Sequence, residues 1–339
     1  MSGAPGHETG AATAAELRVS DELAGSRLDR ALAALTAEGL RGRRRRIAEG
    51  GVLVNGRPCH AAARRLQPGD VLALAEPPGV PASPPESAAR LVGRQGEFCL
   101  LVKAAGLPCA ALAGKAGDSL EGRLAGLCAP VLLPGERPLL LQRLDTGTSG
   151  LVCAALTPVA ADAFRAAEAA GDCEKRYLAV LEGALESPVT ARRALDTRGR
   201  RTSRVLEADG EPLRWTEFLP LHIWRGEACA RLGAHLAEGA EGGEGGHPDG
   251  ARSPRALTLA GCRIRRGARH QIRAHAAALG HPLLGDARYG ATVGERFFLH
   301  HGFLAWPGGA CAVPPPWPWL EERLPPAGLL RVRGWLRLP

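Results

Sequence analysis

A proline-rich segment divides this chain of 339 residues into two unequal parts. Residues 76–90 contain five prolines, and each proline lacks the backbone N–H that a helix or an inner strand requires. We therefore predict a semi-extended linker over residues 76–95. It separates a small folded module, residues 16–75, from a larger domain, residues 96–339.

The small module carries most of the net positive charge of the chain. Between residues 27 and 70 there are ten Arg and four acidic residues, a net charge of +6, whereas the whole chain carries +8. Four of these arginines, Arg43–Arg46, are consecutive. A concentration of guanidinium groups favours a polyanionic partner. The alternative is a solvated charged surface without a partner.

Short helices and strands are predicted for the small module. The helical spacing of apolar residues predicts a helix over residues 27–35, and the basic run predicts a second over 43–49. Residues 52–54 with the turn Asn55–Gly56 predict a hairpin, and a further strand is expected over 71–74. We therefore expect a small α/β module.

The larger domain shows strands mixed with a few helices, without strict alternation of the two. Helices are predicted for residues 119–128, 158–170 and 269–279, and strands for residues 98–103, 151–155, 176–181, 213–219, 228–232 and 257–264. This pattern indicates an α+β fold with a mostly antiparallel sheet. Residues 1–15 predict a disordered tail, and the Gly-rich residues 238–250 predict an insertion loop.

The cysteine content argues against disulfide and zinc scaffolds. There are nine cysteines, an odd number, and no Cys-x-x-Cys pair. We expect reduced thiols in a cytoplasmic protein without a bound metal. No apolar segment near Met1 predicts a signal peptide, and no apolar run has the length of a membrane span.

One carboxylate, Asp145, has a setting typical of a catalytic group. It follows Leu139–Leu141, which predict a buried strand, and it precedes the hydroxyl-rich turn Thr-Gly-Thr-Ser-Gly. An acid at the end of a buried strand is held rigidly at the edge of a core. Arg143 shares a side with Asp145 if the segment is extended, and it would then keep Asp145 ionised. The alternative is a solvated turn with an incidental Arg–Asp pair.

Two enzyme families place an acid in such a sequence. Asp145–Ser149 matches the signature of aspartic proteases, which requires a second Asp-Thr-Gly. Asp196–Thr197 is followed by Arg198 instead of Gly, and Arg143 stands where the protease signature is apolar. The longer string Arg-Leu-Asp-x-x-Thr-Ser-Gly, which begins at Arg143, resembles the catalytic motif of RluA-type pseudouridine synthases. The protease is kept as a remote alternative.

Two further motifs support the resemblance to the synthases. Lys175–Tyr177 resembles the Lys-x-Tyr strand of that family, and residues 267–275 resemble its Gly-Arg-x-His-Gln-Ile-Arg-x-His motif. The resemblance implies that Tyr177 stacks on an extruded base and assists a proton transfer, unless it is an ordinary core residue. His270 and His275 are five residues apart, so they are not a zinc pair on one helix face, and we expect structural roles for both.

Residue 268 departs from the motif. The family has an Arg directly after Gly267, which is taken to pair with the catalytic carboxylate, and this chain has Ala268. Arg269, Arg273 or Arg143 would have to provide that pairing. Gln142 also stands where the family usually has His. These departures motivate a second hypothesis, a catalytically weakened RNA-binding or ribosome-assembly protein on the same scaffold.

The small module resembles an S4 RNA-binding domain. The resemblance rests on Arg27-Leu28-Asp29, the basic second helix, Val54-Asn55-Gly56 and Pro68-Gly69-Asp70. It implies contacts between guanidinium groups and phosphate oxygens, which match in geometry and charge. The residues expected to contact RNA are Arg27, Arg43, Arg44, Arg45, Arg46 and Asn55.

Together these resemblances imply an RNA pseudouridine synthase that isomerises uridine without a cofactor. Asp145 would attack the ribose or first remove a ribose proton, while Arg143 would hold the space or the phosphates around the flipped nucleotide. The S4-like module favours large-subunit ribosomal RNA over transfer RNA as the substrate. We expect a monomer with no membrane partner.

Overall fold

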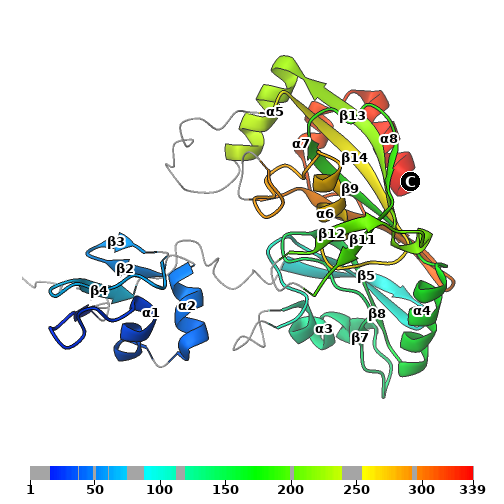
Figure 1. The fold of residues 1–339 in the computed structure, drawn as a ribbon. Coiled ribbons are helices and arrows are strands. Elements are labelled where there is room, and N and C mark those ends of the chain that lie inside the picture. The colour runs from blue at the N-terminus through cyan, green and yellow to red at the C-terminus, as the bar shows by residue number, and fades with distance from the viewer. Residues whose placement is uncertain are drawn as a thin grey trace, which may run out of the picture. The chain divides into compact units, whose positions relative to one another are not determined.

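The structure is a computed structural model that describes residues 16–36, 38–48, 51–59, 61–74, 88–111, 119–198, 202–238, 254–291 and 296–338. Its contacts divide the chain into two compact units, residues 1–82 and 83–339 (Figure 1). The predicted tail and most of the predicted linker lie outside the described residues. The predicted insertion lies outside them as well, apart from Glu238.

The first unit is a four-stranded antiparallel sheet with short helices. In sheet order its strands are β1 (Glu16–Arg18), β4 (Val71–Leu74), β2 (Val52–Val54) and β3 (Arg57–Pro58). Its helices are α1 (Leu28–Ala31), continued by a 3-10 turn (Leu32–Ala34), and α2 (Leu40–Ala48). The fully buried side chains of Leu28, Ile47 and Leu72 join the helices to the sheet in one small core.

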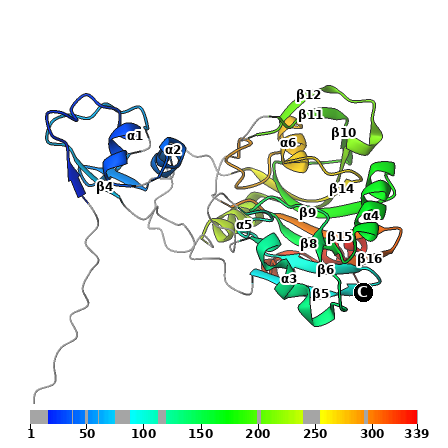
Figure 2. The ribbon, with the colours of Figure 1, turned by 90° about the horizontal axis from the view of Figure 1, so that it is seen from below.

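The second unit is built on a large mixed sheet. Along its main path the strands are β10 (Val189–Ala191), β13 (Thr216–Arg225), β14 (Ala256–Ile264), β9 (Glu174–Glu182), β15 (Leu299–Trp306), β8 (Ser149–Ala155), β6 (Phe98–Lys103) and β5 (Ala89–Gln95) (Figure 2). Strand β7 (Leu139–Leu140) pairs with β8, and β16 (Gly309–Ala312) pairs with β15. Among the described strands, β15 and β8 form the one parallel pair. The predicted α+β fold with a mostly antiparallel sheet is confirmed.

Different helices cover the two faces of this sheet. The helices of the second unit are α3 (Leu120–Cys128), α4 (Pro158–Ala170), α5 (Gly226–Glu238), α6 (Gln271–Ala278), α7 (Trp319–Arg323) and α8 (Pro326–Leu336). Tyr177 of β9 belongs to a core cluster that includes residues of α3 and α6, whereas Leu178 belongs to a cluster with α5, α7 and α8. This alternation is the period of two expected in a strand. No described helix is long and apolar enough to span a membrane.

A separate hairpin lies beside α6. Strands β11 (Arg193–Asp196) and β12 (Arg204–Ala208) pair with each other and not with the large sheet. A side-chain contact connects the hairpin to α6: Nε2 of His275, in that helix, lies 2.9 Å from the Arg193 carbonyl oxygen. Both views of the ribbon show the hairpin next to this helix (Figures 1 and 2).

Two predictions for the second unit are wrong. Residues 228–232 were predicted as a strand but lie in α5, because Cys229, Leu232 and Leu236 recur at helical spacing and pack together on the sheet. The linker predicted over 76–95 is too long, because residues 89–95 form β5, which pairs with β6 at the edge of the sheet. The linker was predicted from the prolines of residues 76–90. Such a count does not take into account that residues 89–95 pair with the next strand, β6.

The parallel pair of β15 and β8 brings distant parts of the chain into close backbone contact. Gly150 has a φ of 119°, and a Cβ at this residue would lie 2.2 Å from the carbonyl oxygen of His301. Only glycine fits such an approach at this φ. Since the turn that carries Asp145 leads directly into β8, this contact also fixes the position of that turn.

We expect Gly150→Ala to lower the free energy of unfolding by about 3 kcal/mol, because a methyl group would force the two strands apart. Chemical denaturation measures the change. Gly126→Ala is the matched control: it lies in α3, where an added Cβ meets no described atom within 4 Å. It should be neutral or stabilise by about 0.5–1 kcal/mol. Wild-type stability of the Gly150→Ala protein would contradict the close approach.

Candidate active site

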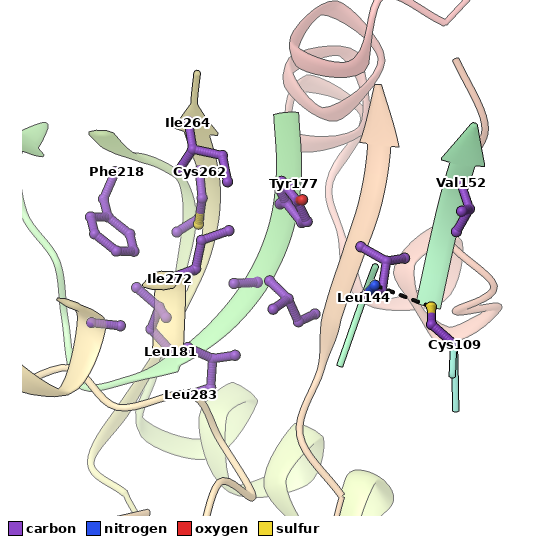
Figure 3. Close-up of a cluster of buried hydrophobic side chains, with 14 of the residues drawn as sticks. Cys109, Leu144, Val152, Tyr177, Leu181, Phe218, Cys262, Ile264, Ile272 and Leu283 are labelled. Atoms are coloured by element: carbon purple, nitrogen blue, oxygen red, sulfur yellow. Dashed lines mark hydrogen bonds between the residues drawn. The ribbon is translucent and has the colours of Figure 1, made fainter. Parts of the chain in front are cut away.

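Asp145 lies in the turn between β7 and β8, where its sequence setting predicts it. Its side chain is 22% exposed, and its carbonyl oxygen accepts a hydrogen bond from the Thr148 N–H at 3.0 Å. The preceding residue, Leu144, is buried, and its N–H donates to the Cys109 sulfur at 3.2 Å (Figure 3). The carboxylate is therefore held at the rim of the core, which a solvated turn would not achieve.

Lys103 stabilises the same turn from inside the protein. Its side chain is fully buried, and its ammonium group donates to the carbonyl oxygens of Ala104 at 2.9 Å, Leu107 at 2.7 Å and Thr146 at 3.2 Å. Burial lowers the pKa of Lys103 to about 8, although the charges of Cys109 and Asp145 oppose this. Sequence reasoning missed this residue; a single Lys that ends an apolar strand was the available signal.

A guanidinium group connects Asp145 to a second carboxylate. Arg273 of α6 donates from Nη1 to Asp145 Oδ2 at 2.8 Å. The same group donates from Nε and Nη2 to the two oxygens of Asp286, at 2.6 and 2.8 Å. The side chains of Arg273 and Asp286 are almost fully buried. The bidentate pair with Asp286 fixes the orientation of the guanidinium group, which holds the candidate catalytic acid Asp145 by one further hydrogen bond.

Aromatic rings enclose this guanidinium group. The Arg273 Cζ atom lies 4.3 Å from the ring centre of Phe297 and 5.3 Å from that of Tyr289, which are distances for cation–π contact. A Cβ at Gly147, in the Asp145 turn, would lie 2.7 Å from the Phe297 ring. The two rings therefore contribute to the near-complete burial of the Arg273 side chain.

The two other arginines proposed to pair with Asp145 do not contact it. Arg269 donates to the Thr202 carbonyl oxygen at 3.2 Å, toward the loop before β12. Arg143 is exposed, and no hydrogen bond or ion pair joins it to another described residue. The predicted Arg143–Asp145 pair is wrong because β7 ends at Leu140, so the period-two argument does not apply to residues 141–145.

The departure at residue 268 therefore costs Asp145 no partner. The Ala268 N–H donates to Gln271 Oε1 at 2.9 Å, which closes the loop at the start of α6. Arg273 is the third residue of that helix and reaches Asp145 from its first turn. The motif thus still provides a paired carboxylate with Ala at position 268.

Tyr177 lies on β9 in the same core cluster as Leu144 and Val152 (Figure 3). Its ring stacks on the imidazole of His301, with ring centres 4.5 Å apart and planes 18° apart. Burial raises the pKa of the Tyr177 phenol, and the charge of Asp145 acts in the same direction. The phenol therefore stays protonated at neutral pH. Burial also lowers the pKa of His301 to about 3, so its ring is neutral.

The two histidines expected to be structural have different surroundings. His275 is fully buried, and its two nitrogens lie 2.8 Å from Thr216 Oγ1 and 2.9 Å from the Arg193 carbonyl oxygen. Its structural role agrees with the prediction. His270 instead places Nε2 3.8 Å from Asp145 Oδ1, so it belongs to the candidate site. The sequence did not indicate this proximity.

The arginines predicted to bind RNA in the first unit also form ion pairs within it. Arg27 Nη2 and Arg44 Nε donate to Asp29 Oδ2 at 3.0 and 2.6 Å. The Arg27 hydrogen bond, joined by that of Arg44, lowers the pKa of the buried Asp29 to about 2. Arg46 pairs with Glu38. These carboxylates hold the guanidinium groups in place, although Arg44 remains half exposed.

The other residues predicted to bind RNA in the first unit are Asn55, Arg43 and Arg45. Asn55 has a φ of 54° in its turn, where its Nδ2 donates to Asp70 Oδ1 at 2.7 Å and its Oδ1 accepts the Val71 N–H at 2.8 Å. Its amide thus serves the hairpin, and we assign it no RNA contact. Arg43 is half-buried, and the side chain of Arg45 lies outside what the structure describes.

A metal site is not part of the described structure. Within the described ranges, no three His, Cys, Asp or Glu side chains are grouped so that they could hold an ion. The groups that the structure places at the Asp145 carboxylate are the guanidinium group of Arg273 and the imidazole of His270.

Comparison with known proteins identifies the family. Residues 97–278, more than half of the chain, match the RNA pseudouridylate synthase family. The chain belongs to this family. It is therefore an RNA pseudouridine synthase, which is an isomerase, and the protease alternative is set aside.

Relatives of the synthase match along most of its length. It is 27% identical over 302 residues to a ribosomal large subunit pseudouridine synthase D of Zymomonas mobilis, covering 85% of this chain and 83% of that protein. A protein of the same name from Xylella fastidiosa is 29% identical over 281 residues, covering 81% and 74%. Human RNA pseudouridylate synthase domain containing 1 superposes over 78% of this chain and 98% of its own, with a TM-score of 0.50 at 23% identity, which supports the fold.

We expect Arg273→Lys to lower the rate of pseudouridine formation by about 100-fold, because one ammonium group cannot bridge two carboxylates in a fixed plane. Single-turnover assays on ribosomal RNA from cells that lack this gene measure the rate. Arg165→Lys is the control, since Arg165 is exposed on α4 and pairs with Asp162. A wild-type rate in the Arg273→Lys enzyme would show that the bridge does not orient Asp145.

Proposed function

We propose that this synthase converts uridine in RNA to pseudouridine with Asp145 as its nucleophile. The observation that carries the proposal is the bridge from Arg273 to Asp145 and Asp286. The bridge orients a carboxylate that remains 22% exposed, so a substrate can reach it. Such preorganisation of a reactive group is what an enzyme requires of its protein scaffold.

The reaction rearranges the bonds at one ribose carbon. The bond between uracil N1 and ribose C1′ breaks, the uracil rotates, and a bond forms between C5 and C1′. In one route Asp145 attacks C1′, and this new bond breaks again when C5 bonds to C1′. In the other route Asp145 removes a ribose proton, which is returned to the ribose when C5 bonds to C1′. In both routes N1 leaves with the bonding electrons. The proton on C5 is finally lost and N1 gains one, so the composition of the nucleoside does not change.

The target base must leave the base stack, at a cost of a few kcal/mol. Tyr177 supports the flipped uracil, because its ring is held by His301 and lies in one cluster with Leu144, the neighbour of Asp145. Arg143, two residues before Asp145 in the sequence, is exposed and is available to hold RNA phosphates or the space left by the base.

The first unit acts in this proposal as an S4-type RNA-binding domain. Its support is the basic helix α2 together with Arg27, and their guanidinium groups are oriented by Asp29 and Glu38. Such groups bind phosphate without sequence choice. The relatives from Zymomonas and Xylella are named as synthases of the large ribosomal subunit, and we propose large-subunit ribosomal RNA as the substrate here.

One of the two reasons for the hypothesis of a catalytically weakened RNA-binding or ribosome-assembly protein does not hold. Ala268 does not deprive Asp145 of a partner, since Arg273 fills that place. Gln142, the other departure, is buried, and its Nε2 has no hydrogen-bond partner among the described residues. No hydrogen bond joins Gln142 to Asp145 among the described residues, so Gln142 is not a partner of that carboxylate in this structure.

Asp145→Asn should abolish pseudouridine formation and leave RNA affinity unchanged, because the amide keeps the size of the side chain but is a poor nucleophile. Mass-based pseudouridine mapping and a binding assay on the same RNA measure the two properties. Asp162→Asn, at an exposed position on α4, is the matched control. Turnover by the Asp145→Asn enzyme would refute the assignment.

Replacing Arg43, Arg44 and Arg46 by Gln should flatten the salt dependence of RNA affinity. Each lost phosphate contact lowers the slope of log K against log salt by about 0.7–0.9. The control replaces three exposed arginines of the second unit, Arg165, Arg231 and Arg333. An unchanged slope in the first variant, with a folded protein, would show that these arginines do not bind phosphate.

A further inference from the structure

His270 has a backbone conformation that most residues avoid. It stands before α6 with a φ of 56° and a ψ of 20°, which is the left-handed region. This conformation costs a residue with a Cβ about 1–2 kcal/mol. Strain of this kind at a buried side chain is a reason to ask what the side chain does.

The side chain of His270 does not stabilise the helix that it precedes. It makes no capping hydrogen bond to the first turn of α6, and the side chain of Gln271 accepts the Ala268 N–H in that region instead. The His270 side chain is only 8% exposed, and it points to Asp145. It therefore differs from His275, whose two nitrogens are both bonded within the fold.

A chain of hydrogen bonds fixes the orientation of the His270 ring. Its Nδ1 lies 3.0 Å from the Tyr289 hydroxyl, which accepts a hydrogen bond from the Ser203 N–H at 2.7 Å. Ser203 precedes β12, and its hydroxyl donates to the Arg269 carbonyl oxygen at 2.5 Å. The hairpin of β11 and β12 is in this way connected to the ring that faces Asp145.

These contacts favour one tautomer of the neutral His270 ring. The Tyr289 hydroxyl has two acceptors for its proton, His270 Nδ1 at 3.0 Å and the Ser203 carbonyl oxygen at 3.4 Å, and the shorter contact is the better hydrogen bond. With Nδ1 as the acceptor, the neutral ring has its hydrogen on Nε2. Nε2 is also the nitrogen nearer to Asp145, at 3.8 Å from Oδ1.

The charge of the ring fits this assignment. Burial lowers the pKa of His270, and the charges of Arg273, Arg288 and Arg269 lower it further, whereas Asp145 opposes them. The ring is therefore neutral at neutral pH. A neutral imidazole N–H can donate a hydrogen bond to one oxygen of Asp145, while the positive charge of Arg273 stays paired with the carboxylate.

We propose that His270 is a positioning residue for Asp145, with its Nε2–H closing on Oδ1 when RNA binds. The carboxylate is then held at both oxygens, by Arg273 at Oδ2 and by His270 at Oδ1, and one rotation of its side chain is removed. Hydrogen bonds that are long in a free enzyme often tighten in its complex. The proposal rests on the function proposed for Asp145.

His270→Ala and His270→Gln test this role. The Ala variant should lower the single-turnover rate constant by about 10- to 100-fold and change the dissociation constant for RNA by less than about twofold. The Gln variant should recover much of the loss, because its amide N–H can reach the same oxygen. His235→Ala, at an exposed residue of α5, is the control.

Tyr289→Phe tests the connection to the hairpin and leaves the ring over Arg273 in place. It should lower the rate constant by about tenfold, because the imidazole loses the partner that fixes its tautomer. A wild-type rate constant in His270→Ala, or a loss that appears only as weaker RNA binding, would overturn the proposal. Equal losses in the Ala and Gln variants would also overturn it, since a donor at this position would then have no effect.

The same assay separates this proposal from the function on which it rests. Wild-type enzyme that forms no pseudouridine, or an active Asp145→Asn variant, would remove the proposed function itself. Active wild type, inactive Asp145→Asn and unaffected His270 variants would remove only the role of His270.

Discussion

The ion pair between Arg273 and Asp145 is the interaction on which the site depends. The guanidinium group is buried, contacts two aromatic rings and also binds Asp286, so several contacts hold it in one position. Burying charged groups carries a desolvation cost that their attraction often does no more than offset. The arrangement therefore fixes the orientation of the Asp145 carboxylate more than it adds to the stability of the fold.

Features carried by local sequence were predictable. The apolar run followed by a hydroxyl-rich turn predicted that Asp145 lies at the rim of the core. The pattern of residues 158–170 predicted helix α4 with its observed bounds. Tyr177 was expected on a strand, and β9 carries it there. These signals work because backbone propensity and apolar periodicity act over a few residues.

Features that depend on distant partners were not predictable from one sequence. Three arginines were candidates to pair with Asp145, and the choice depends on where α6 begins. Since the helix starts at Gln271, Arg269 lies outside it, and Arg273 reaches across 128 positions of sequence. Lys103 and His270 were missed for the same reason, because their importance comes from carbonyl and carboxylate groups that only the folded chain brings near.

The place of β15 in the sheet has a consequence for how a ribosome produces this enzyme. Strand β15 lies between β8 and β9, although it is translated long after both. Before Leu299 is synthesised, no described strand pairing joins β9, which carries Tyr177, to β8, which follows the Asp145 turn. Pairings between such distant segments form slowly. The sheet is therefore completed late in synthesis, when this central strand pairs with both β8 and β9.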